Sequence, residues 1–191
     1  MTLNNDNELS GLFAHKRQLR LAQALLLVLL VGLGLLLSGC GKEDERQKIA
    51  QQAMALESGE ECHLCGMIIG NFPGPKGQLY ERGLQGSMKF CSTRDMFAYA
   101  LDPEHQHNIQ SVFVHDMAKN PWDTPDEETY IDAREAFFVV GSSRKGAMGP
   151  TLASFSQQAD AEAFAREFGG KIQRFDQIDL AQLSNLSHAG H

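Results

Sequence analysis

The prediction of the fold starts from Phe90-Cys91-Ser92-Thr93-Arg94-Asp95-Met96-Phe97-Ala98-Tyr99. A serine followed three residues later by an aspartate is typical of a helix N-terminus, because the Ser92 hydroxyl can accept a hydrogen bond from a backbone N–H group of the first turn. The helix is predicted to continue through Leu101, where Asp102-Pro103 ends it. Segments with strand character lie on both sides of this helix, at residues 77–81, 87–90 and 109–114. This order predicts a ββαβ unit.

A second segment, Phe155-Ser156 followed by Asp160 to Phe164, repeats this pattern. Ser156 is predicted to be the N-cap of a helix that runs through Phe168 and ends at Gly169-Gly170. Predicted strands surround this helix, and a glycine-rich turn separates the first two; the strands are at residues 136–140, 152–155 and 171–175, and the turn is at residues 141–150. The chain is therefore predicted to have an α+β fold built from two related ββαβ modules. Each module alone is too small to be stable, so the two are expected to share one core.

The N-terminal region has the pattern of a lipoprotein signal peptide. A basic patch at residues 16–20 precedes an uncharged apolar run at residues 21–37. The following Leu37-Ser38-Gly39-Cys40 resembles the bacterial lipobox, in which the cysteine thiol takes a diacylglycerol, the chain is cut before the cysteine, and the new amine is acylated. Residues 1–39 are therefore predicted to be an export signal, with Cys40 as the lipid-bearing N-terminus of a periplasm-facing protein. A plain N-terminal anchor helix is the alternative.

The mature chain of 152 residues is predicted to consist of four parts. These are the lipidated Cys40 with a flexible tether through residue 59, two modules at residues 60–120 and 121–180, and a polar C-terminal tail at residues 181–191. The tether is charged and nearly free of aromatic and β-branched residues, so it has no face to bury. In enterobacterial-type sorting an aspartate directly after the lipidated cysteine retains a lipoprotein at the inner membrane. Gly41 at that position favours the outer membrane.

The charge and the motifs of the mature chain argue against two classes of function. It carries 14 basic and 22 acidic residues, a formal charge of −8, and no basic stripe interleaved with aromatic residues, so a nucleic-acid partner is not expected. It also has no Ser/His/Asp order, no pair of carboxylates with separate acid and base roles, and no phosphate-binding loop. An enzyme is therefore not expected.

The chemistry is concentrated in Glu61-Cys62-His63-Leu64-Cys65-Gly66-Met67. Once Cys40 is lipidated, three cysteines remain, and this odd number leaves at least one thiol outside any disulfide. Residues 64–70 are predicted to be an apolar strand, on which Cys65 and Met67 would point the same way. A thiolate and a thioether are soft donors, and soft donors select Cu(I) over hard divalent cations. The motif therefore predicts a Cu(I) site.

Other candidate ligands lie further along the chain. Met148 belongs to Gly146-Ala147-Met148-Gly149-Pro150, a turn without a periodic apolar face, which favours a role as ligand over a role in packing. His115 and Met117 follow a predicted strand, and His115 is the strongest histidine candidate, with a structural hydrogen-bonding role as the alternative. The candidate metal ligands are therefore Cys62, Cys65, Met67, His115, Met117 and Met148.

Several blocks of the mature chain together resemble the NosL-type accessory lipoproteins of nitrous oxide reductase. The resemblance covers essentially the whole mature domain and implies a membrane-tethered Cu(I) chaperone made of two related ββαβ modules. Its implied partners are an ABC-transporter complex and the periplasmic partner of that complex, with copper reaching nitrous oxide reductase directly or through them. Some members lack the first cysteine of the CxxC and the third cysteine, which implies that Cys65 is the essential thiolate. The blocks are Cys62-x-x-Cys65-Gly66-Met67, Phe72-Pro73-Gly74-Pro75-Lys76, Phe90-Cys91-Ser92-Thr93, Val114-His115-Asp116-Met117, Ile131-Asp132-Ala133 and Lys145-Gly146-Ala147-Met148-Gly149.

Three other functions fit the same residues. A structural zinc site would use Cys62, Cys65 and Cys91 together with His115. A thiol–disulfide pair would use the CxxC, although the sequence lacks a thioredoxin-like βαβ setting in which the motif opens a helix. The third alternative is a purely structural lipoprotein that scaffolds the maturation complex.

Overall fold

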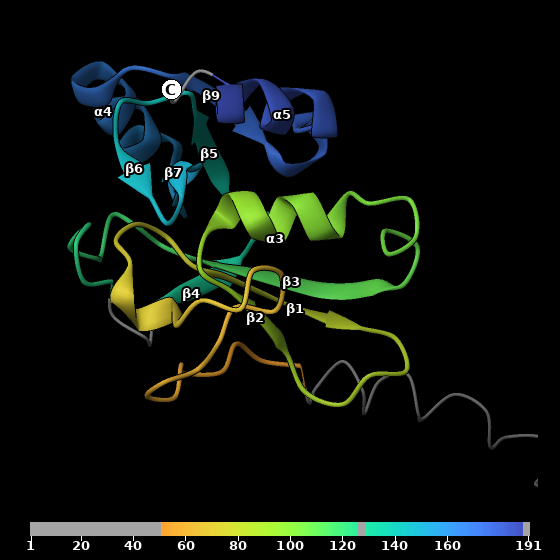
Figure 1. Ribbon diagram of the computed structural model, residues 1–191. Coiled ribbons are helices and arrows are strands. Elements are labelled where there is room, and N and C mark those ends of the chain that lie inside the picture. The colour runs from red at the N-terminus through yellow and green to blue at the C-terminus, as the bar shows by residue number, and fades with distance from the viewer. Residues whose placement is uncertain (1–50, 126–128, 189–191) are drawn as a thin grey trace, which may run out of the picture. The chain divides into compact units, whose positions relative to one another are not determined.

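The computed structural model describes residues 51–125 and 129–188 (Figure 1). The predicted signal peptide, Cys40 and the first part of the predicted tether lie outside the described residues. Within the described ranges, none of the helices has both the length and the apolar character needed to cross a membrane.

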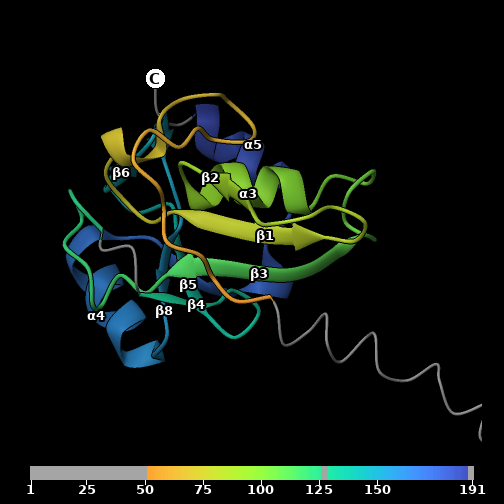
Figure 2. The same cartoon turned by 90° about the horizontal axis from the view of Figure 1, so that it is seen from below.

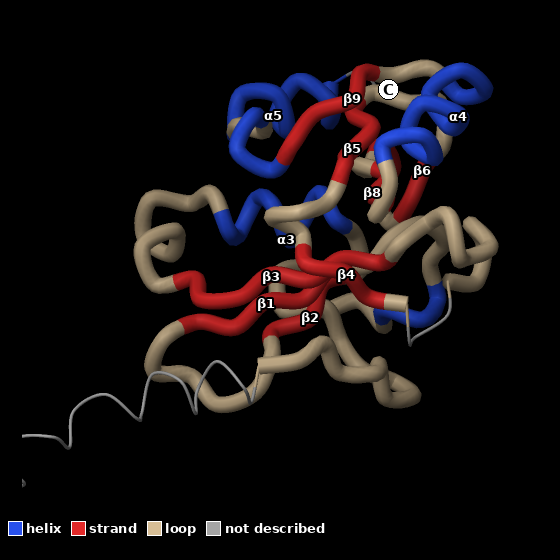
Figure 3. Tube along the Cα trace, turned by 180° about the vertical axis from the view of Figure 1, so that it is seen from behind, coloured by secondary structure: helices blue, strands red, loops and turns tan. Residues whose placement is uncertain are grey.

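The first module is a four-stranded antiparallel sheet with one helix on its face. Its strands are β1 (Gly77–Glu81), β2 (Met88–Phe90), β3 (Ile109–His115) and β4 (Tyr130–Asp132), in the spatial order β2-β1-β3-β4. Helix α3 (Thr93–Ala100) lies across one face of this sheet (Figures 1 and 3). The predicted ββαβ order of this module is confirmed.

The start of α3 is the one expected from the sequence. The backbone N–H of Asp95 donates to the Ser92 hydroxyl at 3.1 Å, so Ser92 is the N-cap. The helix packs very close to β1, because a Cβ atom on Gly77 would lie 2.6 Å from the sulfur of Met96. Glycine at this position therefore allows α3 to sit where it holds Cys91 and Asp95 against the sheet.

The second module repeats the arrangement with three strands. β5 (Phe137–Val140), β8 (Ala153–Phe155) and β9 (Lys171–Arg174) form an antiparallel sheet in the order β8-β5-β9, with α4 (Gln158–Phe168) between β8 and β9 in the chain. The predicted glycine-rich turn contains a hairpin of two short strands, β6 (Lys145–Gly146) and β7 (Gly149–Pro150).

The predicted N-cap of the second helix is wrong. Gln157 precedes α4 and its side chain makes no capping bond. The Ser156 hydroxyl instead donates to the buried carboxylate of Asp116 at 2.7 Å. A tertiary hydrogen bond to Asp116 has therefore replaced the local one.

The two modules share one hydrophobic core, as predicted. The ring of Phe97 on α3 packs nearly edge to face against the ring of Phe138 on β5, with 5.0 Å between the ring centroids. Both side chains are fully buried in a cluster that also contains Leu79 and Leu152. A smaller cluster, which includes Met117 and Phe155, lies between the second sheet and α4.

Residues 64–70 do not form the predicted strand. They make a turn that leads into the short 3-10 helix η1 (Ile69–Asn71). Gly66 has a φ of +72°, in the left-handed region that favours glycine, and its N–H donates to the Cys62 carbonyl at 2.8 Å. The apolar run is therefore interrupted by a glycine turn, and strand parity does not govern Cys65 and Met67.

The predicted polar tail is also wrong for its first part. Residues 180–188 form helix α5 (Leu180–His188), which lies beside α3 (Figure 1). The Asp179 carboxylate accepts a hydrogen bond from the N–H of Gln182 at 2.8 Å, and Leu183 is buried in the shared core. An apolar stripe of widely spaced leucines therefore stabilises a helix in an otherwise polar segment.

The predicted module boundary at residue 120 falls before a strand of the first sheet. β4 pairs with β3 through Phe113 opposite Asp132 and His115 opposite Tyr130. The segment after residue 120 therefore returns to the first sheet before the second module begins.

The predicted flexible tether does not extend to residue 59. Residues 51–60 cross the face of the first sheet that is opposite α3, where Figure 2 shows them in orange over β1 and β3. Met54 exchanges two hydrogen bonds with the buried Gln78 side chain, at 2.8 and 2.9 Å, and the Tyr80 hydroxyl donates to the Gln52 carbonyl at 2.7 Å. Polar side chains of the sheet thus fix a segment that has little apolar surface of its own.

Candidate metal centre

A closed loop presents the first two cysteines. The N–H of Cys62 donates to the Met67 carbonyl at 2.8 Å, and a β-bridge joins Glu61 to Ile68. The loop is attached to β2 through the N–H of His63, which donates to the Lys89 carbonyl at 2.8 Å. This attachment places the loop beside the strand that ends one residue before Cys91.

Three thiols and one carboxylate meet at this point. The sulfur atoms of Cys62, Cys65 and Cys91 and a carboxylate oxygen of Asp95 all lie within 4.8 Å of one another. The Cys65 and Cys91 sulfurs are 3.5 Å apart, and the Cys91 thiol donates to the carboxylate of Asp95 at 3.3 Å. These four residues are called the thiol cluster below.

The four residues of the thiol cluster differ in their exposure to solvent. Cys62, Cys91 and Asp95 are buried, with exposed fractions of 2%, 0% and 5%, whereas Cys65 is partly exposed. An ion therefore reaches the cluster past Cys65. All three cysteines are free thiols, so each sulfur is available as a ligand.

Hydrogen bonds stabilise negative charge on the Cys62 sulfur. Interaction with the Cys91 side chain and hydrogen bonds from the backbone N–H groups of Cys91, Cys65 and Leu64 together outweigh burial and lower the pKa of Cys62 to about 4. The pKa of Cys65 is raised by burial, which is partly offset by the N–H of Met67. At neutral pH the metal-free cluster thus holds one thiolate, on Cys62.

The pKa values of Cys91 and Asp95 are also shifted by their surroundings. Hydrogen bonding to Cys62 and burial raise the pKa of Cys91, and burial raises the pKa of Asp95. Arg94 approaches the Asp95 carboxylate at 3.7 Å and partly offsets this effect of burial. The site is therefore built for soft, thiolate-binding cations, because deprotonation of Cys65 or Cys91 needs a strong Lewis acid for sulfur.

Asp95 is the site residue that sequence reasoning missed. The sequence pattern indicates only its place in the first turn of α3, where its N–H bonds to Ser92. Its side chain faces Cys91, four residues earlier and just before the helix N-cap. The position of Cys91 directly before the N-cap, with Asp95 in the first turn, was a signal that could have suggested contact.

The other predicted ligands lie at different places in the fold. Met67 is on the cysteine loop and packs partly buried against the shared core. Met117 is 8% exposed and packs in the second cluster with Val139 and Phe155. Met148 lies at the tip of the β6–β7 hairpin and is 58% exposed.

His115 does not join the thiol cluster. It is fully buried at the end of β3, where its ring lies 4.2 Å from the ring of Tyr130 and its Nδ1 accepts the Lys76 N–H at 3.4 Å. Among the described histidine, cysteine and acidic side chains, the fourth group beside the three thiols is Asp95. The Cys₃His zinc set considered from the sequence is therefore not assembled.

Met148 has an unusual backbone. Its φ is +58°. Among the described residues other than glycine, it is the one with a positive φ. The β6–β7 hairpin packs against the loop that follows the cysteine motif. The approach is so close that a Cβ atom on Gly74 would lie 3.1 Å from the Gly146 Cα. An exposed methionine held in the left-handed region is poorly explained by packing and points to a functional role.

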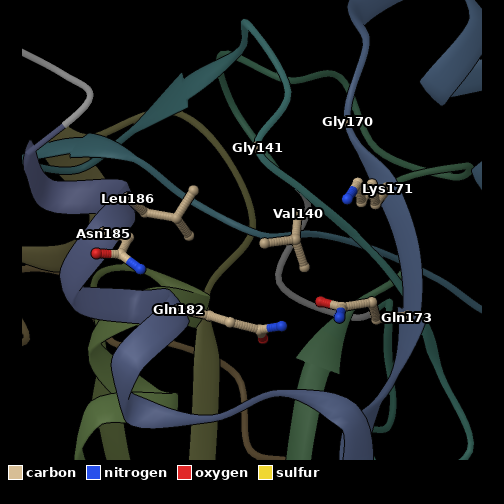
Figure 4. A pocket seen from close by; sticks show the side chains of 8 residues that line it. All are labelled: Val140, Gly141, Gly170, Lys171, Gln173, Gln182, Asn185 and Leu186. Carbon is tan, nitrogen blue, oxygen red and sulfur yellow. The ribbon is translucent and has the colours of Figure 1, made fainter.

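A separate groove of about 540 Å³ lies between α5 and the second sheet (Figure 4). Its lining side chains are apolar, amide or amino groups and include no sulfur; they are Val140, Leu186, Gln173, Gln182, Asn185 and Lys171. The groove therefore does not offer the soft donors of the thiol cluster.

Comparison with protein families and curated proteins gives a consistent result. The family model described as NosL matches residues 53–183. A copper-binding lipoprotein NosL from Stutzerimonas stutzeri is 44% identical over 172 residues, which are 90% of this chain and 88% of the relative. A copper-binding lipoprotein NosL from Achromobacter cycloclastes is 41% identical over 140 residues, which are 72% of this chain and 71% of the relative.

A solved structure has the same fold. The crystal structure of the copper chaperone NosL from Shewanella denitrificans superimposes with a TM-score of 0.67 at 55% sequence identity. The match covers 68% of this chain and 97% of that one. The α+β architecture predicted from the sequence is thus also found in a protein described as a copper chaperone.

Proposed function

The chain belongs to the NosL family, and we propose that it is a lipid-anchored metallochaperone that binds Cu(I) and delivers it for maturation of the copper sites of nitrous oxide reductase. The observation that carries this proposal is the thiol cluster, in which three sulfurs lie within 4.8 Å of one another. Soft sulfur ligands favour Cu(I) over the harder divalent ions. The names of the relatives support copper as the cargo.

The burial of the site suits delivery rather than permanent storage. Two buried thiols hold the ion away from water, while the partly exposed Cys65 gives an incoming ligand access to it. An acceptor can then replace the sulfur ligands one at a time, so Cu(I) is never released free. Met148, exposed on its hairpin, is proposed as an additional thioether ligand during uptake or transfer.

The thiol-redox alternative is weaker than the chaperone proposal. In thioredoxin-like enzymes the CxxC opens a helix, whose N-terminus activates the exposed cysteine. Here the motif lies in a turn that leads to a three-residue 3-10 helix, and the lowered pKa belongs to Cys62, which is 2% exposed. A buried nucleophile is poorly placed to attack a disulfide of another protein.

The partners are proposed from the family resemblance. They are the ABC-transporter complex that serves nitrous oxide reductase, its periplasmic partner, and the reductase itself. The relatives are lipoproteins, which supports a membrane anchor through acylated Cys40 on the periplasmic side. Gly41 after the lipidated cysteine favours the outer membrane.

The test of the proposed function combines metal binding with maturation. The reduced protein is titrated anaerobically with Cu(I) and with Zn²⁺ against chromogenic chelators, and reductase activity is measured in cells that lack the gene and carry wild-type or variant copies. The proposal requires the protein to bind Cu(I) more tightly than Zn²⁺. It also requires the activity of the reductase to be lower in the deletion strain than in the strain that carries the wild-type gene. Preference for Zn²⁺, or full reductase activity without the protein, would refute it.

Oxidation is expected to abolish Cu(I) binding. The Cys65 and Cys91 sulfurs are 3.5 Å apart and Cys62 is in the same cluster, so oxidation in air can join two of them in a disulfide. A disulfide sulfur is not a thiolate ligand. Thiol titration and Cu(I) titration before and after incubation with a reductant measure the effect. Full Cu(I) uptake by protein whose cysteines are oxidised would contradict this expectation.

Cu(I) affinity is expected to rise with pH. Because burial raises the pKa of Cys65 above its ordinary value of 9.0, this thiol is protonated at pH 7 and must lose its proton to bind Cu(I). Cys62, with a pKa of about 4, is already a thiolate and contributes no proton. Each proton released increases the apparent affinity about tenfold per pH unit, so at least this slope is expected between pH 6 and 8. Chelator competition at several pH values measures the slope, and a flat profile would count against Cys65 as a ligand.

Substitution of Cys40 by serine is expected to prevent lipidation. The hydroxyl is a much poorer nucleophile than the thiol for the transfer of diacylglycerol, so the chain should stay unprocessed or unanchored. Cu(I) binding should persist, because the thiol cluster does not include residue 40. Membrane fractionation and mass spectrometry give the result, and a wild-type chain without lipid would show that the lipobox assignment is incorrect.

A further inference from the structure

The inference concerns the end of the first sheet at which the chain from the predicted lipid anchor enters the fold. Gln51 accepts a hydrogen bond from the Ser111 hydroxyl at 2.6 Å, and the carbonyl of Gln52 accepts one from the Tyr80 hydroxyl at 2.7 Å. Tyr80 and Ser111 are opposite each other on β1 and β3. Two loops extend from this end of the sheet, at residues 82–87 and 101–108, and it is called the loop end below.

The thiol cluster lies at the other end of the β1–β2 hairpin. Residues 51–60 run from the loop end toward it, and Met54 reaches Gln78 on the way, with two hydrogen bonds of 2.8 and 2.9 Å. In Figure 2 this orange segment crosses the sheet from near the head of the β1 arrow to its base. β2 runs back from the loop and ends at Phe90, directly before Cys91. The loop and the cluster are therefore at opposite ends.

The chain between the predicted anchor and the sheet is short. Ten residues, 41–50, separate Cys40 from Gln51. A chain of ten residues spans at most about 35 Å when it is fully extended. Residues 51–60 add nothing to this reach, because hydrogen bonds fix them on the sheet. An acyl anchor at Cys40 therefore keeps the loop end close to the bilayer surface.

The β1–β2 loop presents an apolar side chain at the loop end. Leu84 is 55% exposed in a loop that contains Arg82 and no acidic residue. The N–H of Arg82 donates to the Asn108 carbonyl at 2.9 Å, so the loop is held against its neighbour. An exposed apolar residue beside a basic one suits the boundary between lipid headgroups and acyl chains.

The charges at the loop end favour a zwitterionic lipid surface. The neighbouring loop carries Asp102, which is partly exposed, and Glu104, which is exposed. Anionic lipids attract basic segments, so these carboxylates disfavour an anionic surface. Zwitterionic headgroups carry both signs of charge and can pair with Arg82 as well as with the acidic loop.

We propose that the β1–β2 loop contacts the bilayer that holds the lipid anchor, with Leu84 among zwitterionic phospholipids and the thiol cluster facing away from the membrane. This rests on the proposed function, from which it takes the acylated Cys40. Because the anchor already confines the domain to the surface, the contact is intramolecular and needs little affinity of its own. The orientation leaves Cys65 accessible to an acceptor from the periplasmic side.

The test is fluorescence quenching by lipids with brominated acyl chains, on the full lipidated chain in vesicles of phosphatidylcholine and phosphatidylethanolamine. The chain has one tryptophan, Trp122, whose carbonyl accepts the N–H of Gly74 at 2.7 Å, just before the start of β1. The wild type therefore reports on the end of the sheet away from the loop. Gln85→Trp combined with Trp122→Phe moves the reporter next to Leu84. This reporter is expected to lose most of its fluorescence in brominated vesicles, and Trp122 of the wild type is expected to lose none.

Leu84→Glu and Leu180→Glu form a matched pair in this reporter chain. Leu180 is also exposed, at 41%, but lines a pocket with Arg94 and Asp95 of the first turn of α3, away from the loop end. Leu84→Glu should abolish the quenching, and Leu180→Glu should retain it. Flotation with the vesicles establishes that each protein keeps its lipid anchor.

The outcomes distinguish this inference from the proposed function. If the reporter chain floats but its tryptophan is not quenched, or Trp122 is quenched equally, the inference is wrong, while Cu(I) titration of the same sample still supports the chaperone. An emission shift that grows with protein concentration in detergent, without quenching in vesicles, would assign the loop to a second copy and also overturn the inference. A wild-type chain that does not float would overturn the lipid anchor of the proposed function and this inference with it.

Discussion

Substitution of Cys65 by serine is expected to reduce Cu(I) affinity by more than about 100-fold, the upper end of the losses seen when the surroundings of a metal site are altered. Cys65 is the thiol of the cluster that solvent reaches, and its sulfur lies 3.5 Å from that of Cys91. Its loss removes a soft ligand and leaves two sulfurs that are 2% and 0% exposed. A serine hydroxyl is a hard and poorly ionised donor, so it does not replace the thiolate.

Two further variants rank the ligands against Cys65. Cys62→Ser should be less damaging, because this variant keeps Cys65, which the family resemblance implies is the essential thiolate, with its sulfur 3.5 Å from that of Cys91. Met148→Ala should lower the equilibrium affinity less than either cysteine variant, since Met148 lies outside the thiol cluster and is proposed to act during uptake or transfer. Met96→Leu serves as the control, because it removes a core methionine that packs on Gly77 outside the thiol cluster.

The measurement is an anaerobic competition titration against a chromogenic Cu(I) chelator. All variants are expected to remain folded, since Cys65 and Met148 lie in a turn and at a hairpin tip, while Cys62→Ser and Met96→Leu nearly conserve the volume of the side chain. Near-wild-type affinity in Cys65→Ser would overturn the assignment of the site. A larger loss in Cys62→Ser than in Cys65→Ser would mean that the thiolate with the lowered pKa dominates binding.

The parts of the fold that depend on local chemistry could be predicted. Ser92 caps α3 through an Asp95 N–H three residues away, and this pattern is visible in the sequence. The order of strands and helices in both modules follows from such local signals and from alternation of apolar residues. The same reasoning placed Ser156 incorrectly, because its hydroxyl bonds to Asp116, a residue 40 positions away.

The failures at the ends of the folded region have the same origin. Residues 51–59 look like a tether because they bring few apolar side chains, yet the sheet supplies Gln78, Tyr80 and Lys89 as partners for their backbone. Helix α5 looks like a polar tail because Leu183 finds its apolar surroundings only in the assembled core. Partners distant in sequence are invisible to a local pattern.

The residues of the CxxC could be predicted as metal ligands from the sequence, whereas the arrangement of the site in space could not. The choice of Cys62 and Cys65 as soft ligands came from residue type and spacing, and the structure places both sulfurs in one cluster. The reasoning from strand parity was wrong, because Gly66 turns the chain at that point. Asp95 and the position of Cys91 beside the loop depend on how α3 packs on the sheet, which the sequence does not state.

Substitution of Phe138 by alanine is expected to lower the free energy of unfolding by about 3–5 kcal/mol, the usual cost of truncating a buried phenylalanine. Phe138 is on β5 in the second module, is 0% exposed, and contacts the ring of Phe97 in the first module at 5.0 Å. Removing it opens a cavity in the core that both modules use. Both should therefore lose stability together, although the substitution lies in only one of them.

Phe137→Ala is the matched control for this variant. Phe137 is the adjacent residue of β5, points to the opposite face of the sheet, is only partly buried, and carries the guanidinium of Arg174 over its ring at 4.3 Å. Its truncation should cost clearly less, because solvent and neighbouring side chains can fill the space. Chemical denaturation followed by the far-ultraviolet signal and by Trp122 fluorescence gives the two free energies.

Whether the two modules unfold in one transition tests the shared core more stringently than the midpoint of unfolding does. Trp122 lies beside Phe164 of α4, at 5.5 Å between ring centroids, so its fluorescence reports on the second module. Cu(I) retention by the thiol cluster reports on the first. If the core is shared, both signals change together in the wild type and shift by the same amount in Phe138→Ala. Loss of the fluorescence signal while the cluster still holds Cu(I) would show that the first module is stable alone.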